Sequence, residues 1–232
     1  MPVVYRPACQ ADLERADALV VRSINDLTER HGFGPMAAPS PPHFQTFSLA
    51  DDPGGLWVAE DAGEILGFAF SWICGDLWFL AQLFVSPDGQ GHNVGRELLN
   101  RTLEHADKGA ASNKALITFA FNKVSQGLYI GHGLFPRMPI YSFSVERQGL
   151  IDRLPNAQLQ YVALRDSASW LEDLAMIDRK VLGTSREKHH RYLMNDGTTN
   201  GAVLFDGDDP VGYAYVSREG HIGPFAVARP DK

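Results

Sequence analysis

The segment from Leu83 to Arg96 constrains the fold of this chain more than any other. Its sequence, LFVSPDGQGHNVGR, ends an apolar run of strand length, passes through a glycine-rich turn and enters a helix that begins near Asn93. The helix carries apolar residues at three- and four-residue steps, which is the helical period. Such a turn leaves backbone N–H groups unpaired, and the positive end of the helix dipole adds to them. The segment therefore predicts a phosphate or pyrophosphate site, with a plain strand-to-helix turn as the alternative.

The glycine spacing excludes two common phosphate-binding motifs. A dinucleotide fingerprint needs Gly-x-Gly-x-x-Gly, whereas Gly89, Gly91 and Gly95 are separated by one and three residues. A Walker-type loop needs Gly-Lys-Ser/Thr, which does not follow this turn. A different family of phosphate-binding turns is therefore needed to account for the segment.

The turn resembles motif A of the GNAT superfamily of N-acetyltransferases. That motif is Gln/Arg-x-x-Gly-x-Gly/Ala after a strand that ends in Val-x-Pro, and Gln90, Asn93, Val94 and Gly95 fall on it. Asn93 replaces the first glycine, and asparagine tolerates the left-handed backbone better than most residues. Residues 122–134, NKVSQGLYIGHGL, resemble motif B of the same family, Asn-x-x-Ala/Ser-x-x-Leu-Tyr-x-x-x-Gly-Phe, with a departure only at the last position. The resemblance covers residues 1 to about 146.

This resemblance implies that acetyl-CoA is a co-substrate and that its acetyl group passes to a primary amine of a small molecule. It implies Tyr129 as the catalytic residue, a general acid that protonates the departing thiolate; a packed aromatic is the alternative. The implied cofactor-binding residues are the strand edge at Leu83, Phe84 and Val85, the turn and helix start at Gln90, Gly91, His92, Asn93, Val94, Gly95 and Arg96, and the motif B residues Asn122 and Ser125.

No general base can be assigned from the sequence. Many members of the family place a glutamate on the strand before motif A, but residues 78–82 contain no carboxylate. Asp76, Glu60 and Glu29 are candidates by rough location only, and a water relay from the amine to solvent is the alternative. A non-catalytic acyl-CoA-binding regulatory or scaffold module therefore stays open as a second function. No Cys/His ligand set indicates a metal site.

Apolar periodicity predicts an α/β or α+β domain around one mixed sheet. The resemblance implies that this is the GNAT fold, an α/β fold with a mixed and mostly antiparallel sheet flanked by helices. The expected order up to residue 146 is β-α-α-β-β-β-α-β-α-β. The predicted elements are strands at 3–6, 56–60, 65–74, 77–85, 115–121 and 140–145, and helices at 11–30, 43–49, from 93 onwards and at 123–132.

A second part of the chain repeats the beginning of this order. Strands are predicted at 159–164, 202–205, 211–216 and 221–228, with helices at 169–181 and 186–194. The sequence GFAF at 67–70 has a counterpart in GYAY at 212–215, and each follows a short acidic turn. We therefore expect a tandem arrangement: a catalytic domain at 1–147, a linker at 148–157, and at 158–232 a partial second GNAT-like domain that lacks the cofactor loop.

Composition narrows the class of partner. The chain has 232 residues, 28 acidic against 21 basic residues, a net charge of −7 and only two cysteines. An acidic chain without a basic stripe is a poor nucleic-acid binder, and the cysteine content fits a reducing cytoplasm. The long apolar stretch at 65–85 is interrupted by Gly75-Asp76, which favours two strands over a membrane span. We expect a cytoplasmic protein without a membrane or nucleic-acid partner, and a homodimer is compatible with the sequence.

Three further features have predominantly structural interpretations. His189 and His190 lie in a charged stretch and are predicted on a solvated helix face. Most strand aromatics are expected in the core: Trp57, Phe68, Phe70, Trp72, Trp78 and Phe79. The proline-rich segment 32–42 is expected either near the acceptor site, by resemblance to the family, or as a surface spacer.

Overall fold

The computed structural model describes residues 2–153, 159–164 and 170–229. The chain divides into two compact units, Met1–Phe135 and Pro136–Lys232. Each unit has its own sheet and its own apolar core. Within the described ranges, no helix combines the length and the apolar character needed to cross a membrane.

The N-terminal unit contains a five-stranded mixed sheet in the order β1-β2-β3-β4-β5, which confirms the predicted fold class. The first four strands pair antiparallel, and β4 pairs parallel with β5. The apolar stretch at 65–85 forms two of these strands, joined by the turn at Gly75-Asp76 as predicted. The strands are Val4–Pro7 (β1), Leu56–Asp61 (β2), Glu64–Cys74 (β3), Leu77–Val85 (β4) and Asn113–Leu116 (β5).

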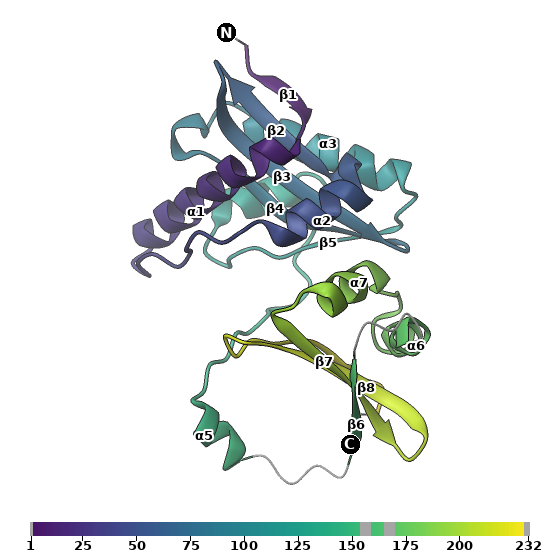
Figure 1. Ribbon diagram of the computed structural model, residues 1–232. Helices are drawn as coiled ribbons and strands as arrows, with labels where there is room; N and C mark the ends of the chain where they lie inside the picture. Colours follow the sequence, from purple (N-terminus) through teal and green to yellow (C-terminus); the bar gives the residue numbers. More distant parts are fainter. Residues whose placement is uncertain (1, 154–158, 165–169, 230–232) are drawn as a thin grey trace. The chain divides into compact units, whose positions relative to one another are not determined.

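Helices cover both faces of this sheet (Figure 1), and side chains that alternate along the strands feed two cores. Phe68, Phe70 and Trp72 of β3 pack on the face of α1 and α2, and Trp78 and Leu80 of β4 pack on the face of α3 and α4. These buried aromatics confirm the expectation that most strand aromatics are core. The helices are Leu13–Arg30 (α1), His43–Asp51 (α2), Val94–Lys108 (α3) and Lys123–Ile130 (α4), with 3₁₀ turns at Gln10–Asp12, Pro53–Gly55 and Pro87–Gly89.

Strand β4 carries one extra residue, and this shapes the edge of the sheet. Phe70 pairs with Gln82 and Ser71 with Leu80, so Ala81 is unpaired in a β-bulge. The parallel pairing of β4 with β5 ends at the same level, with Leu80 opposite Leu116. The predicted strand at 115–121 is therefore wrong beyond Leu116, because β4 offers it no pairing partner there.

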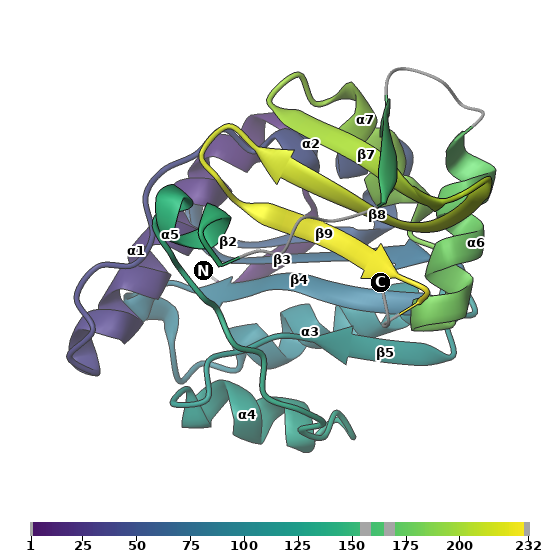
Figure 2. The ribbon, with the colours of Figure 1, turned by 90° about the horizontal axis from the view of Figure 1, so that it is seen from below.

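The C-terminal unit contains an antiparallel four-stranded sheet in the order β6-β7-β8-β9, with its last three strands side by side in Figure 2. Its strands are Gln160–Leu164 (β6), Thr199–Asp206 (β7), Asp209–Ser217 (β8) and Ile222–Val227 (β9). Two helices, Trp170–Leu182 (α6) and Glu187–Asn195 (α7), lie between β6 and β7 along the chain. This is the order and pairing of β1, α1, α2, β2, β3 and β4 in the N-terminal unit.

The irregularities of the two sheets also correspond. One residue of β3, Leu66, is unpaired against β2, and one residue of β8, Val211, is unpaired against β7. The carbonyl of Leu66 accepts from Ser86 N at 2.8 Å, and that of Val211 accepts from Ala228 N at 2.7 Å. The bulge of β4 also has a counterpart, because the pairing of β8 with β9 slips by one residue after Ala214. The echo between GFAF and GYAY thus falls on equivalent strand positions.

Between the two sheets, the structure differs from the sequence prediction. Residues 140–145 form no strand, and Ile140, Tyr141 and Phe143 are exposed. Pro136 and Pro139 lie just before this stretch, and proline cannot donate a ladder hydrogen bond. The predicted linker at 148–157 instead begins inside a short helix, Arg147–Ile151 (α5). Residues 154–158, 165–169 and 230–232, which include the start of the predicted helix at 169, lie outside the described residues.

A buried polar network lies in the core of the C-terminal unit. His190 contacts Asp178 Oδ2 through Nε2 and the Tyr215 hydroxyl through Nδ1, each at 3.0 Å. Tyr213 donates to the other oxygen of Asp178, and the backbone N–H of Arg186 donates to Oδ2 at 2.8 Å. The predicted solvated face is therefore wrong for His190, whose side chain is fully buried. Helices α6 and α7 lie so that His190 of α7 contacts the carboxylate of Asp178 in α6, twelve residues earlier in the chain.

The charge of Asp178 is held by its partners. Burial raises the pKa of this carboxyl, but the hydrogen bonds from His190 and Tyr213 and the charge of Arg186 outweigh burial and lower the pKa to about 2. A carboxyl whose pKa is lower in the folded state stabilises the fold above its ordinary pKa of 3.8, and the contribution is lost as the pH falls towards 2. The shift corresponds to about 2 kcal/mol.

We expect Asp178→Asn to lower the local stability of α6 and β8 by about 3 kcal/mol at pH 7, because it leaves buried partners without a carboxylate. Amide hydrogen exchange of the full chain measures this change. In the wild type, protection should fall as the pH is lowered from 5 to 2, and the variant should lose most of this dependence. Asp209→Asn, at an exposed position of β8, is the matched control. Unchanged exchange in Asp178→Asn would contradict the assignment.

Candidate functional site

The strand-to-helix turn after β4 has the geometry of an anion-binding loop. Its first part is fixed by Ser86, whose hydroxyl accepts a hydrogen bond from Gly89 N at 3.1 Å. Gly91 and Asn93 then adopt positive φ angles of 84° and 61°. Asn93 takes the left-handed conformation that asparagine tolerates, and helix α3 begins at the next residue. Two left-handed residues turn the backbone so that consecutive N–H groups face outward together.

These N–H groups are available to a ligand. Within the described ranges, none of the N–H groups from Gly91 to Arg96 donates a hydrogen bond to another residue, and the Asn93 side chain does not cap the helix. Residues 90–93 are exposed. Unpaired N–H groups and the positive end of the helix dipole together attract an anion. Of the seven residues predicted from Gln90 to Arg96, residues 90–93 and Arg96 are exposed, whereas the Val94 side chain is buried in the core beneath the turn.

The end of β4 presents a free strand edge beside this turn. Pairing with β5 stops at Leu80, so residues 81–85 have no strand partner on that side in the described structure. The predicted residues Leu83, Phe84 and Val85 lie on this edge. The carbonyl of Val85 accepts from the Ser23 hydroxyl of α1 at 3.2 Å, which fixes α1 against the end of the strand. An extended ligand with amide groups can pair with such an edge as an added strand does.

Helix α4 brings the motif B residues to the same region. The side chain of Asn122 caps this helix by accepting from Ser125 N at 3.2 Å, which is a structural role for a predicted ligand residue. Tyr129 is 7% exposed and packs in a core cluster with Trp78 and Leu80 of β4. Tyr129 therefore lies in the core beside the level at which β4 and β5 separate.

Tyr129 is held in its protonated form. Burial raises the pKa of its phenol to about 12, and a side-chain hydrogen bond with Ser125 offsets part of that rise. A phenol with this pKa carries its proton throughout the physiological range and can donate it. The same burial also fits a packing role for the ring of Tyr129.

Helices α3 and α4 are held together at this site. His132 bridges them, with Nδ1 at 2.8 Å from Leu128 O and Nε2 at 3.1 Å from Asn100 Oδ1. A Cβ atom on Gly95 would lie 3.5 Å from Val85 and 3.8 Å from Leu128, so the start of α3 is in close reach of both β4 and α4. The structure thus brings the three groups of predicted residues, on β4, α3 and α4, to one place.

The sequence did not single out Gln82, which lies next to the bulge. Its side-chain oxygen accepts from the Gln45 amide of α2 at 3.2 Å, on the face of the sheet that α1 and α2 cover. The sequence signal that could have found Gln82 is that it is a lone polar residue in an otherwise apolar strand. The base candidates lie elsewhere: Glu60 pairs with Arg6, and Asp76 accepts from Asn113 in the β3–β4 turn. A neutral amide therefore occupies the position beside the bulge.

Ser71, His105 and Asp52 form a chain of hydrogen bonds that resembles a nucleophilic triad. His105 lies 3.1 Å from Ser71 Oγ through Nδ1 and 2.9 Å from Asp52 Oδ1 through Nε2. Ser71 is fully buried, so its hydroxyl has no route to a substrate. A Cβ on Gly55 would meet Ser71 O at 1.9 Å and His105 at 3.0 Å, which shows how tightly the chain packs here. The arrangement joins α3 to the start of β2 and satisfies buried polar groups.

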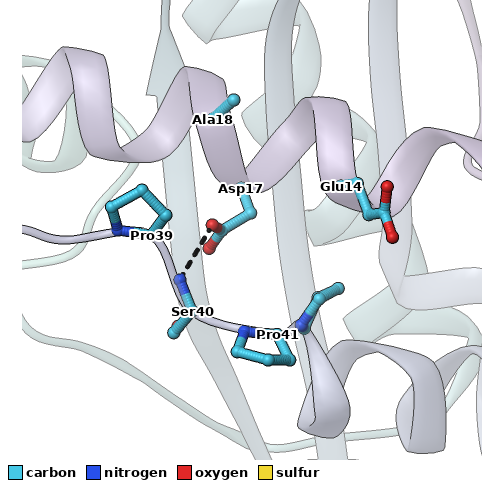
Figure 3. A pocket seen from close by; sticks show the side chains of 7 residues that line it. Glu14, Asp17, Ala18, Pro39, Ser40 and Pro41 are labelled. Carbon is cyan, nitrogen blue, oxygen red and sulfur yellow. Dashed lines mark hydrogen bonds between the residues drawn. The ribbon is translucent and has the colours of Figure 1, made fainter.

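A cavity of about 350 Å³ lies on the outer side of α1 (Figure 3) and is separate from the predicted site. It is lined by Glu14, Asp17, Ala18 and residues 39–42. Ser40 N donates to Asp17 at 3.3 Å, and Asn25 accepts from the N–H groups of Met36 and Ala37. The proline-rich segment is therefore fastened along α1. Among the described residues, no group of three or more His, Cys, Asp or Glu side chains is arranged to hold a metal ion.

Residues 21–133 match the acetyltransferase (GNAT) family. This range contains β2 to β5, the anion-binding turn and α4. The N-terminal unit carries a GNAT acetyltransferase domain. The assignment confirms the family to which motifs A and B pointed, and it does not extend to the C-terminal unit.

Solved structures resemble this chain over part or nearly all of its length. A putative acetyltransferase from Pyrococcus horikoshii is 18% identical, with a TM-score of 0.66 over 99% of this chain and 72% of that chain. PaiA N-acetyltransferase from Thermoplasma acidophilum, in complex with coenzyme A, is 16% identical over 57% of this chain and 89% of its own, with a TM-score of 0.46. At these identities the likeness concerns the fold, and the first of them extends it to both units. No curated protein matches the sequence.

The left-handed conformation of Asn93 yields a direct test of the turn. We expect Asn93→Gly to leave the melting temperature within about 2 °C of the wild type, because glycine adopts positive φ without strain. Asn93→Val should cost about 1–2 kcal/mol, since a β-branched residue is strained at this φ. Thermal unfolding followed by circular dichroism measures both variants. Equal stability of the valine and glycine variants would contradict the turn geometry.

Proposed function

We propose that the GNAT domain transfers an acetyl group from acetyl-CoA to a primary amine of a small molecule, by direct attack on the thioester. The observation that carries the proposal is the free β4 edge that leads into six consecutive N–H groups without a protein acceptor. A pantetheine arm has amides to pair with a strand edge, and its pyrophosphate is the anion that such a helix start binds.

Each predicted residue has a defined part in this proposal. The N–H groups from Gly91 to Arg96 bind the pyrophosphate, and Gln90 lies beside them with its side chain at 3.5 Å from Val85 O. Leu83, Phe84 and Val85 pair with the pantetheine amides. Asn122 and Ser125 hold the first turn of α4, so that they support the arm through the position of that helix.

The chemistry follows from these positions. The amine nitrogen attacks the thioester carbon, and a backbone N–H of Phe84 or Val85 stabilises the oxyanion of the tetrahedral intermediate. The C–S bond then breaks, the acetamide forms, and Tyr129 protonates the departing thiolate of coenzyme A. The proton lost by the amine passes to water, because Gln82 beside the bulge cannot accept it as a carboxylate would. Solvent then reprotonates Tyr129.

We also propose that the C-terminal unit is a partial second GNAT-like module. Its support is the shared order of strands and helices and the matched irregularities at Leu66 and Val211. The boundary between the compact units, after Phe135, precedes the boundary at 147 expected from the sequence. The segment between these positions holds the strand that does not form.

The enzyme assignment is tested by coenzyme A release from acetyl-CoA in the presence of simple primary amines. We expect amine-dependent thiol release, and Tyr129→Phe should lower kcat by about 100-fold, because general-acid catalysis contributes on this order. Phenylalanine keeps the packing and removes only the proton donor, so the dissociation constant for coenzyme A, measured by calorimetry, should stay within twofold. Phe143→Ala is a surface control in the C-terminal unit.

The outcomes separate the candidate functions. Binding of acetyl-CoA without amine-dependent thiol release would favour the non-catalytic acyl-CoA-binding module. A wild-type rate in Tyr129→Phe would assign that residue a packing role. Absence of coenzyme A binding would exclude both functions.

The lack of a carboxylate at Gln82 predicts a pH dependence. The value of kcat/KM should rise tenfold per pH unit up to the pKa of the acceptor amine, because only the free amine attacks. Tyr129, with a pKa of about 12, should produce no decline below pH 11. Rates measured with two amines of different pKa should show that the midpoint moves with the amine. A midpoint near pH 7 for both amines would instead reveal a protein base.

A further inference from the structure

An array of stacked aromatic rings joins two separate segments of the GNAT domain. Phe33 follows α1, whereas Phe119 and Phe121 lie between β5 and α4. The rings of Phe33 and Phe121 stack with centroids 4.8 Å apart and an interplanar angle of 26°. Phe119 continues the stack on Phe121 at 5.0 Å and 11°, and His31 lies 4.8 Å from Phe121. We call these four residues the aromatic array.

The backbone on both sides of the aromatic array is fixed. Phe33 N donates to Thr28 O at 3.0 Å, and the hydroxyl of the buried Thr28 donates to Gly34 O at 2.7 Å. On the other side, the Gln126 amide of α4 donates to Phe119 O and Ala120 O at 3.3 and 2.7 Å. The rings are therefore held in place before any ligand arrives, which lowers the entropy lost on binding.

The two segments place the aromatic array at the separation of β4 and β5. Helix α1 is fastened to the end of β4 by the hydrogen bond from Ser23 to Val85 O, and Phe33 follows the end of this helix. Phe119 and Phe121 come three and five residues after Leu116, where β5 stops pairing. The stack thus joins the α1 side of the free β4 edge to the chain that leads into α4.

Two of the four rings are open to a ligand. Phe33 is 60% exposed and His31 is exposed, whereas Phe119 and Phe121 are half-buried. Exposed aromatic rings arranged in a preformed stack offer a π face to another planar group, and stacking adds to the free energy gained from burial of area. Aliphatic groups of the same size gain only the burial.

We propose that the aromatic array binds the acceptor and selects primary amines that carry a planar aromatic group. The inference rests on the proposed function, because it assigns a substrate class to that same site. It names Phe33 and Phe121 as specificity-determining residues and leaves the transfer chemistry to the β4 edge and Tyr129.

The test compares three primary amines: 2-phenylethylamine, 2-cyclohexylethylamine and n-butylamine. The first two have similar shape and apolar area, and only the first has a planar π system. With the wild type, we expect kcat/KM, calculated on the concentration of the free, unprotonated amine, to be about fivefold higher for 2-phenylethylamine than for 2-cyclohexylethylamine, as stacking energies suggest. Phe121→Ala and Phe33→Ala should reduce this ratio to below twofold, mainly through KM of the aromatic amine. Phe143→Ala, which removes a ring that is 90% exposed in the other unit, should retain the ratio.

The outcomes of these assays distinguish failure of the inference from failure of the proposed function. Thiol release with all three amines at similar kcat/KM would overturn the selection of aromatic acceptors while the acetyltransferase function stands. A weaker affinity for coenzyme A in Phe121→Ala, with an unchanged ratio between amines, would assign the array to the adenine of the cofactor and also overturn the inference. Absence of thiol release with every amine would reject the proposed function, and the inference with it.

Discussion

The unpaired residue Ala81 ends the pairing between β4 and β5, and the candidate site depends on this bulge. An uninterrupted strand would have continued beside β5 and buried its backbone groups in a ladder. The bulge instead leaves residues 81–85 with a free edge, and the same strand then delivers the chain into the turn before α3. Strand edge and helix start are therefore rigidly related, because one short segment contains both.

The helices keep this edge accessible. Helix α1 is fastened to Val85 by Ser23, and α3 and α4 are joined by His132. The first turn of α3 lies close to β4 and α4, since a Cβ atom on Gly95 would be in ordinary van der Waals contact with both Val85 and Leu128. The resulting arrangement holds Tyr129 in an apolar cluster, where burial keeps its proton in place. Local packing thus sets both the geometry and the protonation of the proposed acid.

Local chemistry made part of this architecture predictable. The turn with Gly91 and Asn93, the start of α3 and the alternating strands β3 and β4 follow from backbone conformation and side-chain period, which neighbouring residues determine. The end of β5 at Leu116 was not predictable in this way, because the apolar run continues to Phe121 and only the bulge on another strand stops the pairing. The exposure of His190 was predicted wrongly for a similar reason, because contacts with other parts of the chain determine it. Its charged neighbours indicate solvent, whereas its buried partners Asp178 and Tyr215 lie far away in the sequence.

The central claim is that acetyl-CoA lies along the free β4 edge with its pyrophosphate at the start of α3. Amide hydrogen exchange of the full chain, with and without coenzyme A, tests it directly at the level of the backbone. The account predicts new protection at Leu83, Val85 and residues 91–96, because the N–H groups there gain acceptors from the cofactor, and no change in β9. Tight binding of coenzyme A with protection confined to other segments would contradict it.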